Sequence, residues 1–250
     1  MTASATPMSL DVILPWRAAH VAEMNCQVTK DSIHDRPGWT IEYLLRLDEV
    51  PVGYGSVAVL GPWKDRPTIY QMYVEPPHRG RVFDLFEALA EASGAVAVET
   101  QSNDPVLTVM LHTYCRDVAP EAIVFQDRLT TALPPPDGAA FRRKTQEHTE
   151  WALDVAGETV ATGGLLWHYN RPYGDIYMEV AEAHRRRGYG AYLVQEIKRA
   201  CYELGGIPAC RCNVNNVASR KTLQKAGFVP CGNILAGTLP PPGASEKPTP

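Results

Sequence analysis

The sequence predicts an α/β protein made of two domains, and three observations support this fold class. A proline-rich segment separates two halves, the second half alternates between strand and helix patterns, and one strand–turn–helix pattern occurs twice. The chain has 250 residues, which is enough for one large domain or two small ones.

The domain boundaries follow from the composition. The segment "LTTALPPPDGAAF" holds three consecutive prolines and an Asp-Gly turn pair. The last stretch, "PPPGASEKPTP", is also proline-rich and has the composition of a disordered tail. We therefore predict a first domain at 1–133, a linker at 134–140, a second domain at 141–240 and a disordered tail at 241–250.

The second half begins with strand patterns. The stretch "WALDVAGETVATGGLLWHY" predicts two strands joined by a hairpin at residues 156–157. Residues 175–180, "DIYMEV", alternate between apolar and polar side chains. This alternation predicts a third strand whose polar face carries Asp175, Tyr177 and Glu179.

Two helices and one strand follow the turn "HRRRGYG". Apolar residues recur at helical spacing from Leu193 to Leu204, and a Gly-Gly pair then stops the helix. "IPACRCNV" predicts a short strand, and Asn215 or Asn216 can cap a further helix that ends at Ala226. The order is strand, turn, helix, strand, helix.

An internal repeat supports the two-domain prediction. "MYVEPPHRGRVFD" (residues 72–84) aligns without gaps on "MEVAEAHRRRGYG" (residues 178–190), and five positions are identical. A second strand and helix pattern follows both segments. Two copies of one supersecondary unit explain the match most simply.

The turn of the second copy is a candidate anion site. A helix that starts after a strand presents unpaired main-chain N–H groups and the positive end of its dipole. Gly188 and Gly190 leave space for an anion beside these groups, and Arg185, Arg186 and Arg187 add positive charge. The alternative for this loop is an ordinary solvated surface turn. The spacing does not fit a P-loop or a G-x-G-x-x-G dinucleotide motif.

Two motifs carry a family resemblance. The pattern V-x-x-x-x-R-x-x-G-x-G, formed by Val180, Arg185, Gly188 and Gly190, resembles the acetyl-CoA loop of the GNAT acetyltransferase superfamily. The downstream "NVNNVASRKTLQKAGFVPCG" resembles the next motif of that family. The residues that carry this second resemblance are Asn216, Ala218, Ser219, Lys225, Gly227 and Phe228.

The resemblance implies a fold and a cofactor. Each domain is expected to be GNAT-like, with a mixed, mostly antiparallel sheet flanked by helices and containing a splayed pair of strands. Acetyl-CoA would be the co-substrate, with its diphosphate on the amides of the loop and its pantetheine arm along the strand at a bulge. No metal is expected. The coenzyme-binding residues implied are Val180, Arg185, Arg186, Arg187, Gly188, Tyr189, Gly190, Asn216 and Ser219.

The implied reaction is direct transfer of an acetyl group to a primary amine. An amine with a pKa of about 10.4 must lose a proton before it attacks, so a carboxylate near the splay is needed. Glu179 is the preferred base and Tyr177 the second catalytic candidate; His168 is a more distant alternative. Many family members carry a proton-donating Tyr where this chain has Leu223.

The first copy differs at the positions that would bind the coenzyme. Val82 and Asp84 stand where the second copy has Gly188 and Gly190, and they place a branched side chain and a negative charge there. We therefore predict that 1–133 is a degenerate GNAT-like domain. In the second domain, residues 141–150 are too few for the opening strand and two helices of the family.

Composition limits the other functions. The net charge of −4 and the pI near 6.0 argue against nucleic-acid binding, and no apolar run or basic leader predicts a membrane span or a secretion signal. The six cysteines predict no disulfide framework, so we expect a reduced, cytoplasmic protein. Cys210 and Cys212 lack the usual spacing of a zinc site and fit a buried strand better.

The partner predicted for this chain is a small-molecule amine, with a protein N-terminus or a lysine as the other acceptors. The alternative function is an acyl-CoA-binding sensor or pseudoenzyme, which the missing Tyr at Leu223 and the unassigned base would fit. Nucleic-acid and membrane partners are not expected.

Overall fold

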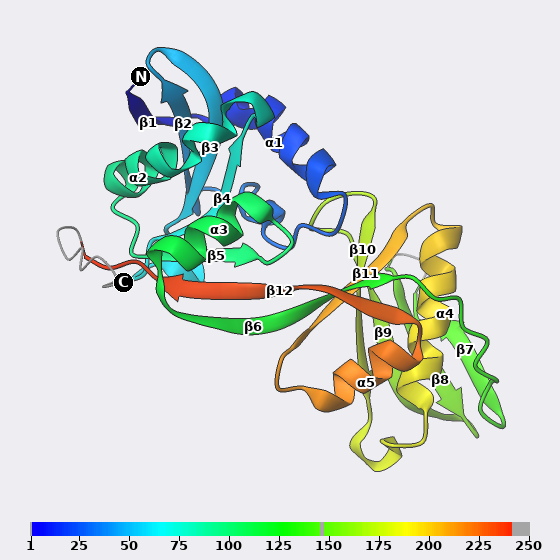
Figure 1. Ribbon diagram of the computed structural model, residues 1–250. Coiled ribbons are helices and arrows are strands. Elements are labelled where there is room, and N and C mark those ends of the chain that lie inside the picture. Colours follow the sequence, from blue (N-terminus) through cyan, green and yellow to red (C-terminus); the bar gives the residue numbers. More distant parts are fainter. Residues whose placement is uncertain (1, 146–147, 242–250) are drawn as a thin grey trace. The chain divides into compact units, whose positions relative to one another are not determined.

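The computed structural model describes residues 2–145 and 148–241 and divides into two compact units (Figure 1). The first unit comprises Met1–Glu121 and Asn233–Pro250, and the second comprises Ala122–Gly232. The boundaries fall inside two long strands, β6 (Arg116–Asp127) and β12 (Phe228–Thr238), so each strand contributes to both units.

This division differs from the predicted one, which placed the boundary in the proline-rich segment 134–140. That segment lies inside the second unit, because the chain has already begun to pair there in β6. The C-terminal part of β12 returns to the first unit and pairs with β5 (Ala97–Gln101). Most of the predicted tail, residues 242–250, lies outside the described residues.

The first unit contains a mostly antiparallel sheet with helices around it. Its strand order is β1-β2-β3-β4-β5-β12, where only β4 and β5 pair in parallel. The remaining elements of this unit are β1 (Ala3–Met8), α1 (Leu10–Met24), η1 (Asp31–Ile33), β2 (Thr40–Leu47), β3 (Val50–Ala58), η2 (Gly61–Trp63), β4 (Thr68–Val74), η3 (Pro76–Arg81), α2 (Val82–Ser93) and α3 (Pro105–Tyr114).

The second unit has the same plan, with strand order β6-β11-β10-β9-β8-β7 and a single parallel pair, β10 with β11. Its other elements are β7 (Ala139–Arg143), β8 (Glu150–Val155), β9 (Glu158–Leu166), β10 (Tyr173–Val180), η4 (Glu182–His184), α4 (Tyr189–Glu203), β11 (Ile207–Asn213) and α5 (Val217–Lys225). The predicted hairpin, strands and helices of this half are confirmed, and Asn216 is the residue that caps α5.

The second unit has a strand, β7, before β8 but no helix between the two in the described residues. The residues before β8 were predicted to be too few for the opening strand and two helices of the family; β7 supplies the strand alone and pairs with β8 along its whole length. Between β7 and β8 the described residues contain no helix, whereas the first unit has α1 between β1 and β2. A five-residue edge strand needs little chain, and the two missing helices do not fit into so short a connection.

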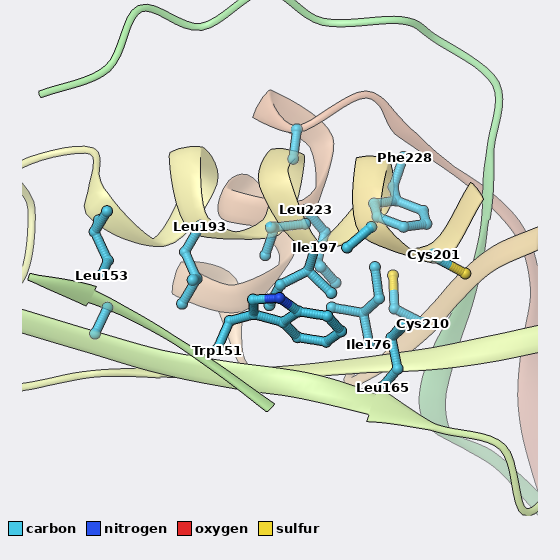
Figure 2. Packing of buried hydrophobic residues seen from close by; sticks show 14 of the residues in the cluster. Trp151, Leu153, Leu165, Ile176, Leu193, Ile197, Cys201, Cys210, Leu223 and Phe228 are labelled. Atoms are coloured by element: carbon cyan, nitrogen blue, oxygen red, sulfur yellow. The ribbon is translucent and has the colours of Figure 1, made fainter. Parts of the chain in front are cut away.

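Each unit has its own apolar core. In the second unit α4 lies over the sheet, with Leu193 and Ile197 packed on Trp151 and Ile176 (Figure 2). Cys210 lies fully buried in this core, as the strand interpretation of that segment predicted. In the first unit the main core lies between the sheet and helices α2 and α3, and a smaller cluster packs α1 against β3 and β4.

The internal repeat is visible in the backbone. β4 ends at Val74 and β10 at Val180, and both strands are followed by a 3₁₀ turn and a helix. Arg79 Nε donates to the carbonyl of Val74 at 2.9 Å, and Arg185 Nε donates to that of Val180 at 3.2 Å. Equivalent residues therefore make equivalent contacts in the two units. No helix in the described part of the chain has both the length and the apolar run needed to cross a membrane.

Candidate coenzyme site and acyl-transfer site

The loop between β10 and α4 presents free main-chain amides. After η4 the chain passes through Arg186 with φ +64° and Gly188 with φ +87°, and α4 begins at Tyr189. Within the described residues, no acceptor bonds the main-chain N–H groups of residues 186–191. These groups lie at the positive end of a 15-residue helix, so the loop has the geometry of an anion site.

The two glycines of this loop have different physical roles. Gly188 has a left-handed backbone, which side-chain-bearing residues adopt only at a cost of about 1–2 kcal/mol. Gly190 is buried, and a Cβ there would lie 3.1 Å from Val180 Cγ2 and 3.2 Å from Thr222 Cγ2. Gly190 thus allows the first turn of α4 to pack on β10 and α5, a role beyond the exposure of amides that the sequence predicted.

Positive charge gathers at the loop without carboxylate partners. Among the described residues, Arg186, Arg187 and Lys225 form no ion pair. Lys225 comes from the last turn of α5, and its Nζ lies 3.9 Å from the point where a Cβ of Gly188 would be. In the sequence Lys225 is only part of the second motif, because the packing of α5 on α4 is what brings it to the loop.

Arg185 differs from its two neighbours. Its Nε holds the carbonyl of Val180, the last residue of β10. The carbonyl of Val180 is therefore occupied, and the guanidinium of Arg185 connects the loop to the strand end. Arg186 and Arg187 have no comparable contact within the described chain.

β10 and β11 separate, as the predicted splay requires. They pair only from Tyr173 with Ile207 to Asp175 with Ala209, and beyond this point β10 pairs with β9 alone. Ala181 N donates to Val160 O, which makes Ala181 and Val160 a hydrogen-bonded pair. In an antiparallel ladder such pairs alternate with pairs that are not hydrogen-bonded. Met178 and Val180 belong to the second kind, so their N–H and C=O groups point away from β9, toward the open edge.

The predicted bulge at Val180 is absent. The pairing of β10 with β9 runs from Asp175 to Val180 without a shift in register. The open edge results instead from the departure of β11, which pairs with β6 on its other side.

The two catalytic candidates lie on one face of β10. Ile176, Met178 and Val180 contribute to the core under α4, so Tyr177 and Glu179 lie on the opposite face. Glu179 is exposed, and its carboxylate forms no ion pair among the described residues. The Tyr177 side chain extends over Gly164 of β9 toward Glu150 of β8, away from the edge that β11 leaves open.

Tyr177 has a perturbed environment. Its hydroxyl donates to Glu150 Oε1 at 3.0 Å, and Lys144 Nζ lies 3.2 Å from the other oxygen of that carboxylate. Partial burial, with a contribution from Glu150, raises the pKa of Tyr177 to about 12. The phenol therefore remains protonated at neutral pH.

The remaining predicted residues have structural contacts. The side-chain oxygen of Asn216 accepts from Ser219 N at 3.0 Å and caps α5, so that oxygen is occupied. Leu223 is buried in the core and carries no proton to donate. His168 lies beyond the end of β9, with its ring against Tyr169.

The corresponding loop of the first unit is closed. η3 is six residues long and runs directly into α2, and Val82 has an ordinary helical φ of −63° with its N–H bonded to Arg79 O. Asp84 forms an ion pair with Arg81 at 2.5 Å, so a carboxylate occupies the start of the helix. That the first copy lacks a diphosphate site stays a prediction.

Comparison with known protein families connects this geometry to a known fold. Residues 121–228 match the model of the acetyltransferase (GNAT) family. The match spans β6 to the start of β12 and includes the open loop, the splay and α5.

Solved structures extend the likeness to the whole chain. A GNAT-family acetyltransferase from Colwellia psychrerythraea is 14% identical with a TM-score of 0.74, over 95% of this chain and all of that one. A tandem GNAT protein from the clavulanic acid biosynthesis pathway is 13% identical (TM-score 0.58; 94% and 98% covered). A GCN5-related N-acetyltransferase from Sphaerobacter thermophilus is 15% identical (TM-score 0.56; 95% and 96% covered).

These likenesses establish the fold of the chain as two GNAT-like units, as the sequence predicted. A search of curated proteins finds no match.

Proposed function

We propose that the second unit is an acetyl-CoA-dependent N-acetyltransferase. The observation that carries this proposal is the loop at residues 185–190, where unpaired amides, unpaired cations and a helix N-terminus converge. A diphosphate needs these groups, and the GNAT-family match covers the same residues.

The donor set fits coenzyme A. Amides of residues 186–190 would hold the diphosphate, with Arg186, Arg187 and Lys225 adding charge-assisted bonds. The N–H of Val180 and the main chain of Met178 are free to pair with the pantetheine arm along the open edge. Bound there, the coenzyme would supply an acetyl thioester. Asn216 and Ser219 would contact the arm from the start of α5.

A protonated amine loses one proton before it attacks and a second as the amide forms, and the departing thiolate takes up one. The amine nitrogen forms a bond to the acetyl carbon while the carbon–sulfur bond breaks. Glu179 accepts the first proton, because its carboxylate is exposed and forms no ion pair among the described residues; the second passes to water. Water returns a proton to the thiolate, because the hydroxyl of Tyr177 already donates to Glu150 on β8. A thiol with a pKa of about 8.5 needs only modest assistance to leave.

The acceptor is proposed to be a small-molecule amine. The free carboxylate of Glu179 attracts a protonated amine to the face of β10 that α4 does not cover. A protein N-terminus or a lysine side chain is the other acceptor class. A sensor that binds the acyl coenzyme without turnover is the alternative function.

Two measurements test the proposal. Calorimetry with coenzyme A measures binding, and release of free thiol from acetyl-CoA is followed across a panel of amines. In the Glu179→Gln variant we expect turnover to fall by about 100-fold near neutral pH and less at high pH, where the amine loses its proton unaided. Glu203→Gln, an exposed carboxylate at the end of α4, is the control. Tight binding without thiol release for any amine would favour the sensor.

A further inference from the structure

The first unit contains a cavity at its own strand splay. β4 and β5 pair only at Thr68–Ala97 and Ile69–Val98 before they part. A cavity of about 230 Å³ lies next to this opening, between the second half of α1, the end of β4 and the start of α3. The cavity occupies the position in the first unit that is equivalent to the open edge of β10 in the second. Met72 and Arg79 in the cavity wall align with Met178 and Arg185 in the repeat.

The cavity is not a coenzyme site. The adjacent loop is closed by η3 and by the ion pair between Arg81 and Asp84. The cavity volume equals that of about eight molecules of liquid water, which is enough for a small metabolite. The first unit has therefore kept the space at the strand end without the loop that would hold a diphosphate.

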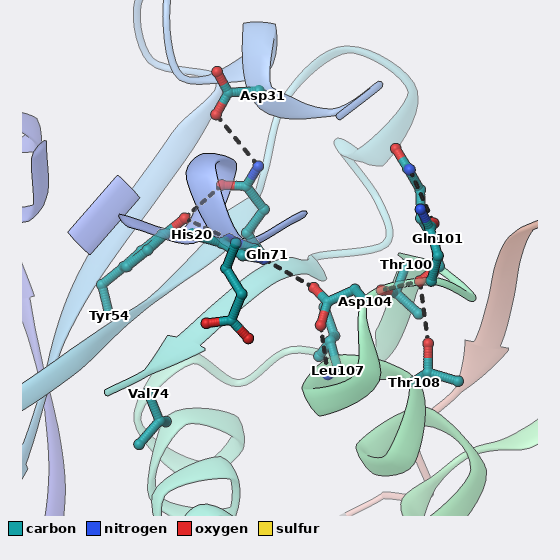
Figure 3. Close-up of polar contacts among 12 residues, drawn as sticks. His20, Asp31, Tyr54, Gln71, Val74, Thr100, Gln101, Asp104, Leu107 and Thr108 are labelled. Atoms are coloured by element: carbon teal, nitrogen blue, oxygen red, sulfur yellow. Dashed lines mark hydrogen bonds and ion pairs between the residues drawn. The ribbon is translucent and has the colours of Figure 1, made fainter. Parts of the chain in front are cut away.

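The floor of the cavity is a buried polar network. His20 Nε2 lies 3.1 Å from Asp104 Oδ2, and His20 Nδ1 lies 3.0 Å from the hydroxyl of Tyr54. Tyr54 donates to Gln71 Oε1, as Figure 3 shows together with the His20–Asp104 contact. Gln71 in turn contacts His34, which pairs with a buried carboxylate.

Part of this arrangement is structural, because Asp104 Oδ1 accepts from Leu107 N at 3.1 Å and caps α3. The other oxygen, Oδ2, contacts His20. His20 and Asp104 are each less than 10% exposed, and the cavity is the open space that they adjoin. A few polar groups at the floor of a mostly apolar cavity are typical of a ligand site.

The mouth of the cavity carries both signs of charge. Arg79 Nη2 and Glu23 Oε2 lie 2.6 Å apart, and both side chains are partly exposed. The guanidinium has five N–H groups, and its contacts with Val74 and Glu23 use Nε and Nη2, so donors remain for a carboxylate. Glu23 and Asp104 can accept from an ammonium group.

The walls between these charges are apolar. Met24 and Met72 are thioether side chains, which adapt to ligands of irregular shape, and Val106 closes the side toward α3. The ring of Tyr73 lies under the guanidinium of Arg79, 5.6 Å away.

We propose that this cavity binds a free α-amino acid. The carboxylate of the ligand would meet Arg79, its ammonium would lie between Glu23 and Asp104, and its side chain would lie on Met24, Met72 and Val106. This proposal concerns the first unit and does not depend on catalysis in the second.

Calorimetry on the full chain tests the proposal with the twenty common amino acids, titrated one at a time. We expect at least one to bind at millimolar concentration or below. Arg79→Gln should weaken that affinity by about tenfold or more, because a charge-assisted bond is lost. Val106→Trp should abolish binding by filling the cavity and leaving the polar groups in place. Arg185→Gln, the same change at the equivalent position of the second unit, should leave this affinity unchanged.

Three outcomes would overturn the assignment. One is the absence of binding heat with every amino acid at millimolar concentration. Another is unchanged affinity in both Arg79→Gln and Val106→Trp while circular dichroism shows that the variants are folded. The third is a loss in Arg185→Gln equal to that in Arg79→Gln, which would locate the ligand in the second unit.

Discussion

Replacing Gly188 by valine tests whether the backbone of the loop, as distinct from its charges, holds the diphosphate. Gly188 has φ +87°, and only the ammonium of Lys225 lies within 4 Å of the position that a Cβ would take there. Valine therefore meets little steric resistance at that site but cannot hold the left-handed backbone without a cost of about 1–2 kcal/mol. We expect the backbone to turn part of the way toward the ordinary helical φ that Val82 shows in the first unit.

The expected loss of affinity follows from the amides that turn away. Each charge-assisted hydrogen bond to an anion is worth about 1.5–3 kcal/mol, which corresponds to about tenfold or more in the dissociation constant. If two amides are redirected, coenzyme A should bind about 100-fold more weakly. Calorimetry with coenzyme A measures this change directly.

Gly157 supplies a matched control. It lies in the hairpin between β8 and β9 with φ +84°, and nothing lies within 4 Å of a Cβ added there. Gly157→Val therefore carries the same backbone strain, and both variants should lose about 1–2 kcal/mol in free energy of unfolding. Only Gly188→Val should lose coenzyme affinity. Unchanged affinity in Gly188→Val, or an equal loss in Gly157→Val, would refute the reasoning.

Three further predictions concern the second unit. Lys225→Met should weaken coenzyme A binding several-fold in calorimetry, with the largest effect at low salt. Lys221→Met on the same helix is the control and should leave the affinity unchanged. Equal effects of the two variants would contradict a specific contact between Lys225 and the diphosphate. Arg185→Gln should raise the KM for acetyl-CoA through loss of its bond to the strand carbonyl. Hydrogen exchange of the Ala181 amide, which bonds Val160 O at the end of β10, should accelerate; unchanged exchange would contradict this positioning role. The phenol of Tyr177 should titrate near pH 12 in ultraviolet absorbance, and Glu150→Gln should lower that pKa. The pKa of Tyr177 in the folded protein lies above the ordinary value of 10, so the phenol stabilises the folded state below pH 10, and this contribution is lost as the pH rises through 12. A titration midpoint of the phenol at pH 10 would disprove its contact with Glu150.

Local patterns in the sequence were sufficient for most of the second unit. The alternation of residues 175–180 predicted β10, the apolar spacing after Gly190 predicted α4, and Asn216 was one of two predicted caps for α5. These features depend on residues that are close in the chain. Because the repeat aligns residues 72–84 with residues 178–190, it also predicted a strand and a helix where β4 and α2 lie.

The tertiary structure alone decided which distant segments meet. The division of the chain inside β6 and β12 depends on pairs such as Ile234 with Gln101 and Cys210 with Phe125, and main-chain pairing leaves no periodic signal that names the partner strand. For the same reason no pattern placed Lys225 beside Gly188. The cavity of the first unit is likewise built from α1, β4 and α3, whose residues come together only when the helices pack on the sheet.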